Sequence, residues 1–124
     1  MSDDPRSAMI QDGNIMRIEN ALVEETFCFN DSSGYIIVSY SVPGENNTSF
    51  IEYIRLNFSR NTVIINSFGQ NVCPCCLQKG MWVNVIFSSR MTRSIPPQSG
   101  ALLIVVKRGI QTPSSVTTAP VAYV

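Results

Sequence analysis

Residues 35–58 read YIIVSYSVPGENNTSFIEYIRLNF, and this stretch decides the fold class. Over residues 35–42, apolar side chains recur at every second position, which is the period of a half-buried β-strand. The Pro, Gly and Asn residues of 43–47 then break the chain, as turn-forming residues do. The alternation resumes over residues 50–58, so the stretch predicts two strands joined by a turn.

Further short stretches of the chain have the composition of strands, because they are rich in β-branched and aromatic residues. They comprise residues 13–19, 22–29, 62–66, 81–87 and 101–106. No window of a dozen residues shows a helical period. Short strands separated by turn signals are typical of a sandwich or a barrel. We therefore expect an all-β domain of five or six mostly antiparallel strands.

The run LQKGMWVNV at residues 77–85 places a leucine, a glycine and two valines in the order Leu-x-x-Gly-x-x-Val-x-Val. This run resembles a signature of small bacterial OB-like β-barrel domains, whose families are largely uncharacterised. The apolar strand at 101–106 and the run at 62–65 are similar to strands of such domains. The resemblance covers residues 13–108 in pattern and 61–107 in motif. It implies a small OB-like barrel and supplies no catalytic residue.

A chain of 124 residues has the usual length of one domain. Residues 1–12 are polar, acidic and aperiodic, so we expect a flexible lead-in before a barrel domain at 13–108. Residues 109–124 are uncharged and rich in Thr, Ser and Pro, which predicts a flexible tail. The first residues do not resemble a signal peptide, and no apolar run approaches the roughly 20 residues needed to span a bilayer. These observations predict a cytoplasmic protein with no membrane partner.

The charged residues are divided between the two parts of the chain. All nine acidic residues lie at or before Glu52, whereas residues 53–124 contain seven Lys or Arg and no acid. Such an asymmetry suggests an anionic partner, although the charges would intermix if strands from the two parts pair. The chain also contains no histidine, which excludes Ser-His-Asp and Cys-His catalytic sites. We therefore expect no catalytic residues and a protein that is not an enzyme.

Residues 88–100 join the two strongest strands and contain Arg90, Arg93 and a Pro-Pro pair. Arginine can hold a phosphate or carboxylate through two hydrogen bonds. Strand aromatics beside arginines form stacking platforms for single-stranded nucleic acid. The residues that we expect to bind such a ligand are Arg90, Arg93, Arg55, Lys79, Tyr53 and Trp82. Alternatively, the loop is merely solvated and the rings fill the core, since a one-residue change in register inverts every side chain.

Three of the four cysteines lie within Cys73-Pro74-Cys75-Cys76. Without a secretion signal, we expect them to be reduced thiols. Cys73, Cys75 and Cys76 would then be thiolate ligands for zinc or Cu(I), with no other cofactor expected. The spacing of Cys73 and Cys76 also fits a redox pair, and the remaining alternative is a set of inert loop cysteines.

These observations predict a non-enzymatic binding module for an extended anionic ligand, with single-stranded nucleic acid as the leading example. A structural or self-assembling β-domain, present as a homo-oligomer, is one alternative. Its acidic surface would meet the basic surface of the next copy, or an edge strand would pair across a dimer. Thiol-based metal binding through the cysteine cluster at 73–76 is the other alternative.

Overall fold

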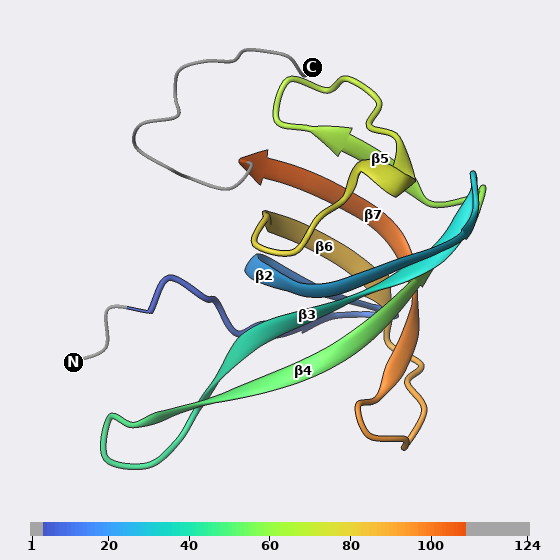
Figure 1. The fold of residues 1–124 in the computed structure, drawn as a ribbon. Helices are drawn as coiled ribbons and strands as arrows, with labels where there is room; N and C mark the ends of the chain where they lie inside the picture. Colours follow the sequence, from blue (N-terminus) through green and yellow to red (C-terminus); the bar gives the residue numbers. More distant parts are fainter. Residues whose placement is uncertain (1–3, 109–124) are drawn as a thin grey trace.

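The computed structural model describes the backbone of residues 4–108 and the side chains up to Lys107. Within this range the regular structure consists of strands and one short 3₁₀ turn (Figure 1). The elements are β1 (Met9–Asp12), β2 (Ile15–Asn30), β3 (Ser33–Pro43), β4 (Ser49–Phe58), β5 (Val63–Asn66), η1 (Pro74–Cys76), β6 (Trp82–Ser88) and β7 (Gln98–Arg108). The prediction of a small all-β barrel is confirmed. No helix of the described residues is long and apolar enough to cross a membrane.

Five of the strands close into a barrel. Strands β2, β3 and β4 pair in sequence and antiparallel, β4 then pairs with β7 in parallel, and β7 pairs with β6. Strand β6 completes the circle by pairing with β2. Outside this circle, β1 pairs with β2, and β5 pairs with β7 in parallel. The strongly curved strands of Figure 1 wrap around one core.

Strand β2 is longer than the sequence predicts, because the expected strands at 13–19 and 22–29 form one continuous element. Its first half pairs with β1 and β6, and its second half pairs with β3. The pairing with β6 shifts between Ile18 and Ala21, and the pairing with β3 shifts between Val23 and Glu25. Such irregularities bend a strand and increase its twist. The bent strand can therefore pair with β6 along its first half and with β3 along its second half.

The interior of the barrel is filled by every second residue of the strands, as the apolar alternation predicts. These residues include Ile18, Val23, Ile36, Val38, Ile54, Leu56, Val83, Val85, Phe87 and Ile104. Phe50 shares the parity of Ile54 but is 58% exposed. The reason is that β3 and β4 continue beyond the barrel as a hairpin, which projects at the lower left of Figure 1. Side chains near its tip have no opposing strand to cover them.

The tip of this hairpin is a two-residue turn. Asn46 and Asn47 have φ values of 57° and 63°, and the Thr48 N–H donates to the Glu45 carbonyl oxygen over 3.0 Å. Positive φ at both central residues matches the type I′ turn, whose twist suits a hairpin. Asparagine adopts this left-handed conformation more readily than most residues.

Residues 4–12, the described part of the predicted flexible lead-in at 1–12, lie against the barrel. Residues 9–12 form β1, and residues 4–8 are held against the barrel by hydrogen bonds. Arg6 Nε donates to Ser39 Oγ over 2.8 Å, and the Ser7 N–H donates to the Asn20 carbonyl oxygen over 3.0 Å. Because polar contacts hold this segment, it shows no apolar period in the sequence. The predicted tail at 109–124 lies outside the described residues.

Gly34 is a position at which we expect a side chain to be poorly tolerated. A Cβ atom there would lie 2.8 Å from the Phe58 ring and 2.9 Å from Cys28 Cα, and it would also overlap the Phe27 carbonyl oxygen. Because two of these neighbours are backbone atoms, relief requires movement of β2 against β3. We expect Gly34→Ala to lower the free energy of unfolding by about 1–3 kcal/mol, as for other overpacked sites. Urea denaturation followed by circular dichroism measures this change.

Gly100→Ala is the matched control, since a Cβ atom at Gly100 would meet no atom within 4 Å. We expect this variant to unfold within about 0.5 kcal/mol of the wild type, as surface substitutions usually do. Equal midpoints for the Gly34 and Gly100 variants would contradict the close approach of β2 and β3 at Gly34.

Candidate functional site

Three aromatic rings lie on the outer surface where β2 runs into β3. Phe27 and Phe29 alternate with Cys28, so they share the face of β2 that points away from the barrel interior. Phe27 pairs directly with Tyr35 of β3. Phe27 is 48% exposed and Phe29 is 60% exposed. Large apolar rings at such exposure leave a hydrophobic surface that contacts water.

The rings and one arginine form a continuous group. The Phe27 and Tyr35 rings are stacked, with centroids 5.8 Å apart and planes at 25°. The Phe27 and Phe29 rings meet edge to face at 5.0 Å. The guanidinium carbon of Arg55 lies 3.8 Å from the Tyr35 ring centroid, which is a cation–π contact. We call Phe27, Phe29, Tyr35 and Arg55 the aromatic face.

Arg55 is held in place by its neighbours on β4 and by the end of the β6–β7 loop. Its backbone N–H donates to the Pro97 carbonyl oxygen over 2.9 Å, and its Nε donates to Asn57 Oδ1 over 3.0 Å. Asn57 Nδ2 in turn donates to Gln98 Oε1 over 3.4 Å. Within the described part of the chain, Arg55 forms no ion pair with a carboxylate. Its positive charge is therefore available to an external anion.

One carboxylate borders the aromatic face. The Tyr35 hydroxyl donates to Glu25 Oε2 over 3.1 Å. This hydrogen bond, together with desolvation and the charge of Glu25, raises the pKa of Tyr35, and the positive charge of Arg55 opposes the shift. The Tyr35 hydroxyl therefore stays protonated at physiological pH and keeps its hydrogen bond to Glu25.

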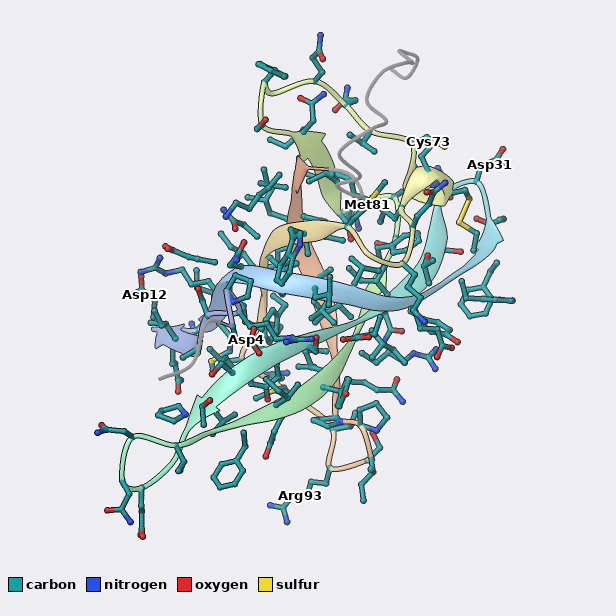
Figure 2. All side chains as sticks on the ribbon, turned by 60° about the vertical axis from the view of Figure 1, so that its left-hand side comes forward. Asp4, Asp12, Asp31, Cys73, Met81 and Arg93 are labelled. Atoms are coloured by element: carbon teal, nitrogen blue, oxygen red, sulfur yellow. A yellow bond between two sulfur atoms is a disulfide. The ribbon has the colours of Figure 1, made fainter. Side chains whose placement is uncertain are left out.

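The structure brings four of the six predicted binding residues toward one side of the barrel. Tyr53 lies two positions before Arg55 on the same face of β4 and is 47% exposed. Arg90 and Arg93 lie on the exposed loop that enters β7, and β7 pairs with β4 through Arg55 and Gln98. Figure 2 shows Arg93 at the end of the molecule opposite Asp31 and Cys73. The side of β3 and β4 therefore lies between the arginine loop and the β2–β3 turn.

Lys79 and Trp82 are not part of this group. Trp82 lies on β6, where it pairs with Leu22 of β2, and β6 is separated from β4 by β7. Lys79 lies in the connection between η1 and β6. Trp82 is half-buried, as Tyr35 is, so its distance from the aromatic face and not its burial sets it apart.

The sequence prediction did not include the three rings of the aromatic face among the binding residues. The signal was present at Phe27 and Phe29, since a cysteine between two phenylalanines in a strand places both rings on one face. The neighbours of Tyr35 on the outer face could not be assigned without the register of β3. Pairing with Phe27 provides that register.

The two oppositely charged parts of the sequence do not form separate domains. Strands from the two parts pair with one another, namely β2 with β6, and β3 with the residues of β4 that follow Glu52. Lys107 Nζ also donates to Asn20 Oδ1 over 2.9 Å. The two parts are thus interleaved in one sheet, although the ion pairs among the described residues all lie within the first part.

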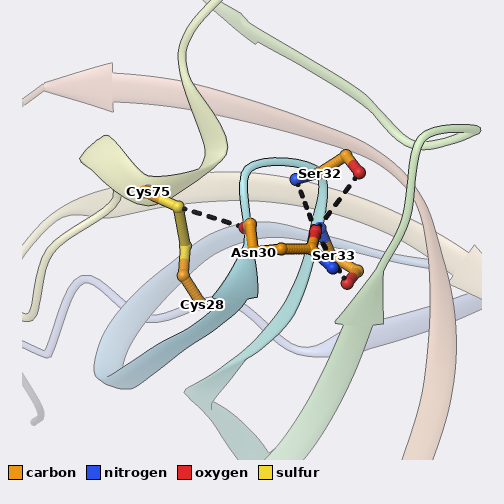
Figure 3. Close-up of a disulfide and its surroundings, with 5 residues drawn as sticks. All are labelled: Cys28, Asn30, Ser32, Ser33 and Cys75. Carbon is orange, nitrogen blue, oxygen red and sulfur yellow. Dashed lines mark hydrogen bonds between the residues drawn. A yellow bond between two sulfur atoms is a disulfide. The ribbon is translucent and has the colours of Figure 1, made fainter.

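A disulfide joins Cys28 of β2 to Cys75 of η1, with a Cα–Cα distance of 5.7 Å (Figure 3). The prediction of four reduced thiols is wrong for this pair. Cys75 Sγ also lies 3.4 Å from the carbonyl oxygen of Asn30. The Asn30 side chain accepts hydrogen bonds from the backbone N–H groups of Ser32 and Ser33, which stabilise the β2–β3 turn. The disulfide therefore attaches η1 next to an ordered turn.

Cys73 and Cys76 are free and exposed. The pKa of the Cys76 thiol is raised, chiefly by its hydrogen bond with Cys73, and further by desolvation and by the charge of Cys73. A metal site through Cys73, Cys75 and Cys76 would first require reduction of the Cys28–Cys75 bond. Over residues 4–108, no three His, Cys, Asp or Glu residues converge to hold an ion.

Comparisons with known proteins add no assignment to this geometry. No family model, no curated protein and no solved structure matches the chain.

Proposed function

We propose that this protein is a non-enzymatic OB-like module that binds single-stranded nucleic acid across the aromatic face. The observation that carries this proposal is the stack of Arg55, Tyr35 and Phe27, with Phe29 at its end. Exposed rings stack on bases of any sequence, and a neighbouring arginine meets the phosphates. The proposed ligand is thus an extended chain that carries bases and negative charge.

The position of the aromatic face within the barrel supports this ligand. OB-folds are five-stranded barrels that bind oligonucleotides on the face of their second and third strands, flanked by the loops after the first and fourth strands. Strands β1 and β5 lie outside the barrel and are left out of this count. The second and third strands of the barrel are then β3 and β4, which carry Tyr35 and Arg55. The flanking loops are the β2–β3 turn and the β6–β7 loop with Arg90 and Arg93. The site therefore coincides with the usual binding face of such barrels.

The proposal is tested by fluorescence anisotropy of labelled oligo-dT and oligo-U over a salt series. We expect binding by the wild type that weakens as salt rises, because phosphate contacts release counterions. Phe27→Ala should weaken binding about 5- to 100-fold, since one base-stacking ring contributes about 1–3 kcal/mol. Arg55→Ala should weaken binding and lower the salt slope by about 1, as should each arginine of the β6–β7 loop that contacts a phosphate.

Two substitutions of the same type, placed elsewhere, serve as controls. Phe68→Ala removes a ring that is 86% exposed near β5, and Arg17→Ala removes a charge that is paired with Glu19 on the opposite side of the barrel. Neither should change the affinity by more than about twofold, a change of about 0.4 kcal/mol. Equal losses for the face and control variants, or no binding by the wild type at low salt, would refute the proposed site.

Self-assembly is a second candidate, favoured by the hairpin that projects from the barrel with Phe50 exposed. An exposed ring and adjacent strand edges are suited to contact with a second copy. Light scattering over a range of concentrations tests this candidate, and a monomer at low salt and high concentration would exclude it.

Disulfides persist in oxidising compartments. The Cys28–Cys75 bond therefore favours an oxidising compartment, and the cytoplasmic location predicted from the sequence stays a prediction.

A further inference from the structure

The cysteines at one end of the barrel form a group that the proposed function does not use. The Cys28–Cys75 disulfide removes Cys75 from the run at 73–76 and fixes η1 to β2. Cys73 and Cys76 remain as two exposed thiols with two residues between them. This arrangement separates the group into one closed disulfide and one open dithiol.

The backbone of η1 brings the two free thiols together. The Cys76 N–H donates to the Cys73 carbonyl oxygen over 2.9 Å, which closes a turn between these residues. The first and fourth residues of such a turn have Cα atoms less than about 7 Å apart. Disulfides bridge Cα atoms about 4.4–6.8 Å apart. This turn therefore brings the exposed side chains of Cys73 and Cys76 within the range that a disulfide can bridge.

The turn is anchored on both sides, so it does not have to unfold for the two thiols to react. Cys75 is bound to Cys28, and Leu77 is 2% exposed within the core. Slightly further along the chain, the Gly80 N–H donates to the Val23 carbonyl oxygen over 2.8 Å. Because both thiols are exposed, burial in the core does not block closure of a bond between Cys73 and Cys76.

We propose that Cys73 and Cys76 form a thiol–disulfide exchange site that reduces low-molecular-weight disulfides and closes a second disulfide in the protein. This site is independent of the aromatic face, and its substrate class is a small dialkyl disulfide such as oxidised glutathione. Exposure of both thiols gives such a substrate access.

The reaction proceeds by two exchange steps. Cys73 is the first nucleophile and Cys76 the resolving thiol, since the pKa of Cys76 is raised beside Cys73. Cys73 attacks one sulfur of the substrate, the substrate S–S bond breaks, and one small thiolate leaves and takes up a proton from water. Cys76 then loses its proton to water and attacks the Cys73 sulfur, which expels the second small thiolate. Two protein thiols are oxidised, and one small disulfide is reduced to two thiols.

The experiment uses the full chain with its Cys28–Cys75 disulfide intact and oxidised glutathione as the probe. After the remaining thiols are blocked with iodoacetamide, intact and tandem mass spectrometry locate the disulfides. We expect a new Cys73–Cys76 bond, an unchanged Cys28–Cys75 bond and two molecules of reduced glutathione released per chain. Cys76→Ser should instead stop at one glutathione attached to Cys73, because the resolving thiol is missing.

Three outcomes would overturn the proposal. They are separate glutathione adducts on both Cys73 and Cys76, a new bond from Cys28 to either residue, and no reaction while urea-unfolded protein reacts. Cys73→Ser/Cys76→Ser is the background control, and its circular dichroism spectrum should match that of the wild type because both side chains are exposed. None of these readouts depends on nucleic-acid binding, so the two proposals fail independently.

Discussion

Phe87→Ala is expected to lower the free energy of unfolding by about 3–5 kcal/mol, the range observed for large aromatic residues truncated in a core. Phe87 of β6 is fully buried, and its ring is among the largest side chains in the interior. Strand β6, which carries Phe87, lies between β2 and β7 and closes the barrel by pairing with both. The substitution would leave a cavity at the closing strand, where the neighbours are paired on both sides and cannot collapse freely.

Chemical denaturation followed by Trp82 fluorescence and circular dichroism measures this loss. Phe68→Ala is the matched control, since it makes the same chemical change at a ring that is 86% exposed. We expect the Phe68 variant to unfold within about 0.5 kcal/mol of the wild type. A Phe87 variant as stable as the Phe68 variant would show that β6 does not close the barrel in solution.

Removal of the Cys28–Cys75 disulfide is expected to lower the free energy of unfolding by about 4 kcal/mol. The bond joins residues separated by 47 positions, and the loss of loop entropy in the unfolded chain at this length corresponds to that value. The double substitution Cys28→Ala/Cys75→Ala removes the bond without leaving a partner thiol. Urea denaturation without reductant should show the loss, and wild-type protein in excess dithiothreitol should unfold at the same midpoint as this variant.

Cys73→Ala/Cys76→Ala is the control for this measurement, because it also removes two sulfur atoms from the same segment. Both of its side chains are exposed and free. We expect its stability to be close to that of the wild type under non-reducing conditions. If the two double variants unfolded at the same urea concentration, the disulfide would not constrain the unfolded chain.

The strands and their buried faces were predictable because each depends on local alternation. Residues 35–42 and 50–58 formed strands with Ile36, Val38 and Ile54 inside, as the period of two indicates. Phe50 is an exception, because the alternation predicts a buried side chain there and the side chain is exposed. The alternation identifies a face but does not show how far the opposing strands extend, and Phe50 lies beyond them.

The binding residues were predicted only in part, since their grouping depends on pairing between distant strands. Tyr53 and Arg55 were placed on one face by their spacing along β4, and the structure agrees. By contrast, Tyr35 joined Arg55 through the register of β3 against β4, which no local pattern encodes. Trp82 lies on β6, which is separated from β4 by β7, so composition alone could not show that it lies apart from Arg55.

The prediction of reduced thiols was wrong for Cys28 and Cys75 for a related reason. Cys28 and Cys75 meet because β2 continues as far as Asn30 and η1 packs beside that end of the strand. The sequence predicted that Cys73, Cys75 and Cys76 would act together, since they are adjacent in the chain. The turn at η1 instead directs Cys75 to β2 and leaves the other two side by side.

The way in which the barrel closes also determines the order of events during synthesis. Strand β2, the first strand of the barrel, pairs with β6, for example between Ile15 and Ser88. Strand β4 cannot pair with β7 until Gln98, at the start of β7, has been synthesised. Only β1 and the meander of β2, β3 and β4 can form from the portion of the chain made early. Its apolar inner surface then lies open until the last strand emerges from the ribosome. Non-local pairing of this kind slows folding and exposes strands to aggregation. The nascent chain should therefore depend on chaperone protection until residues near 108 have been added.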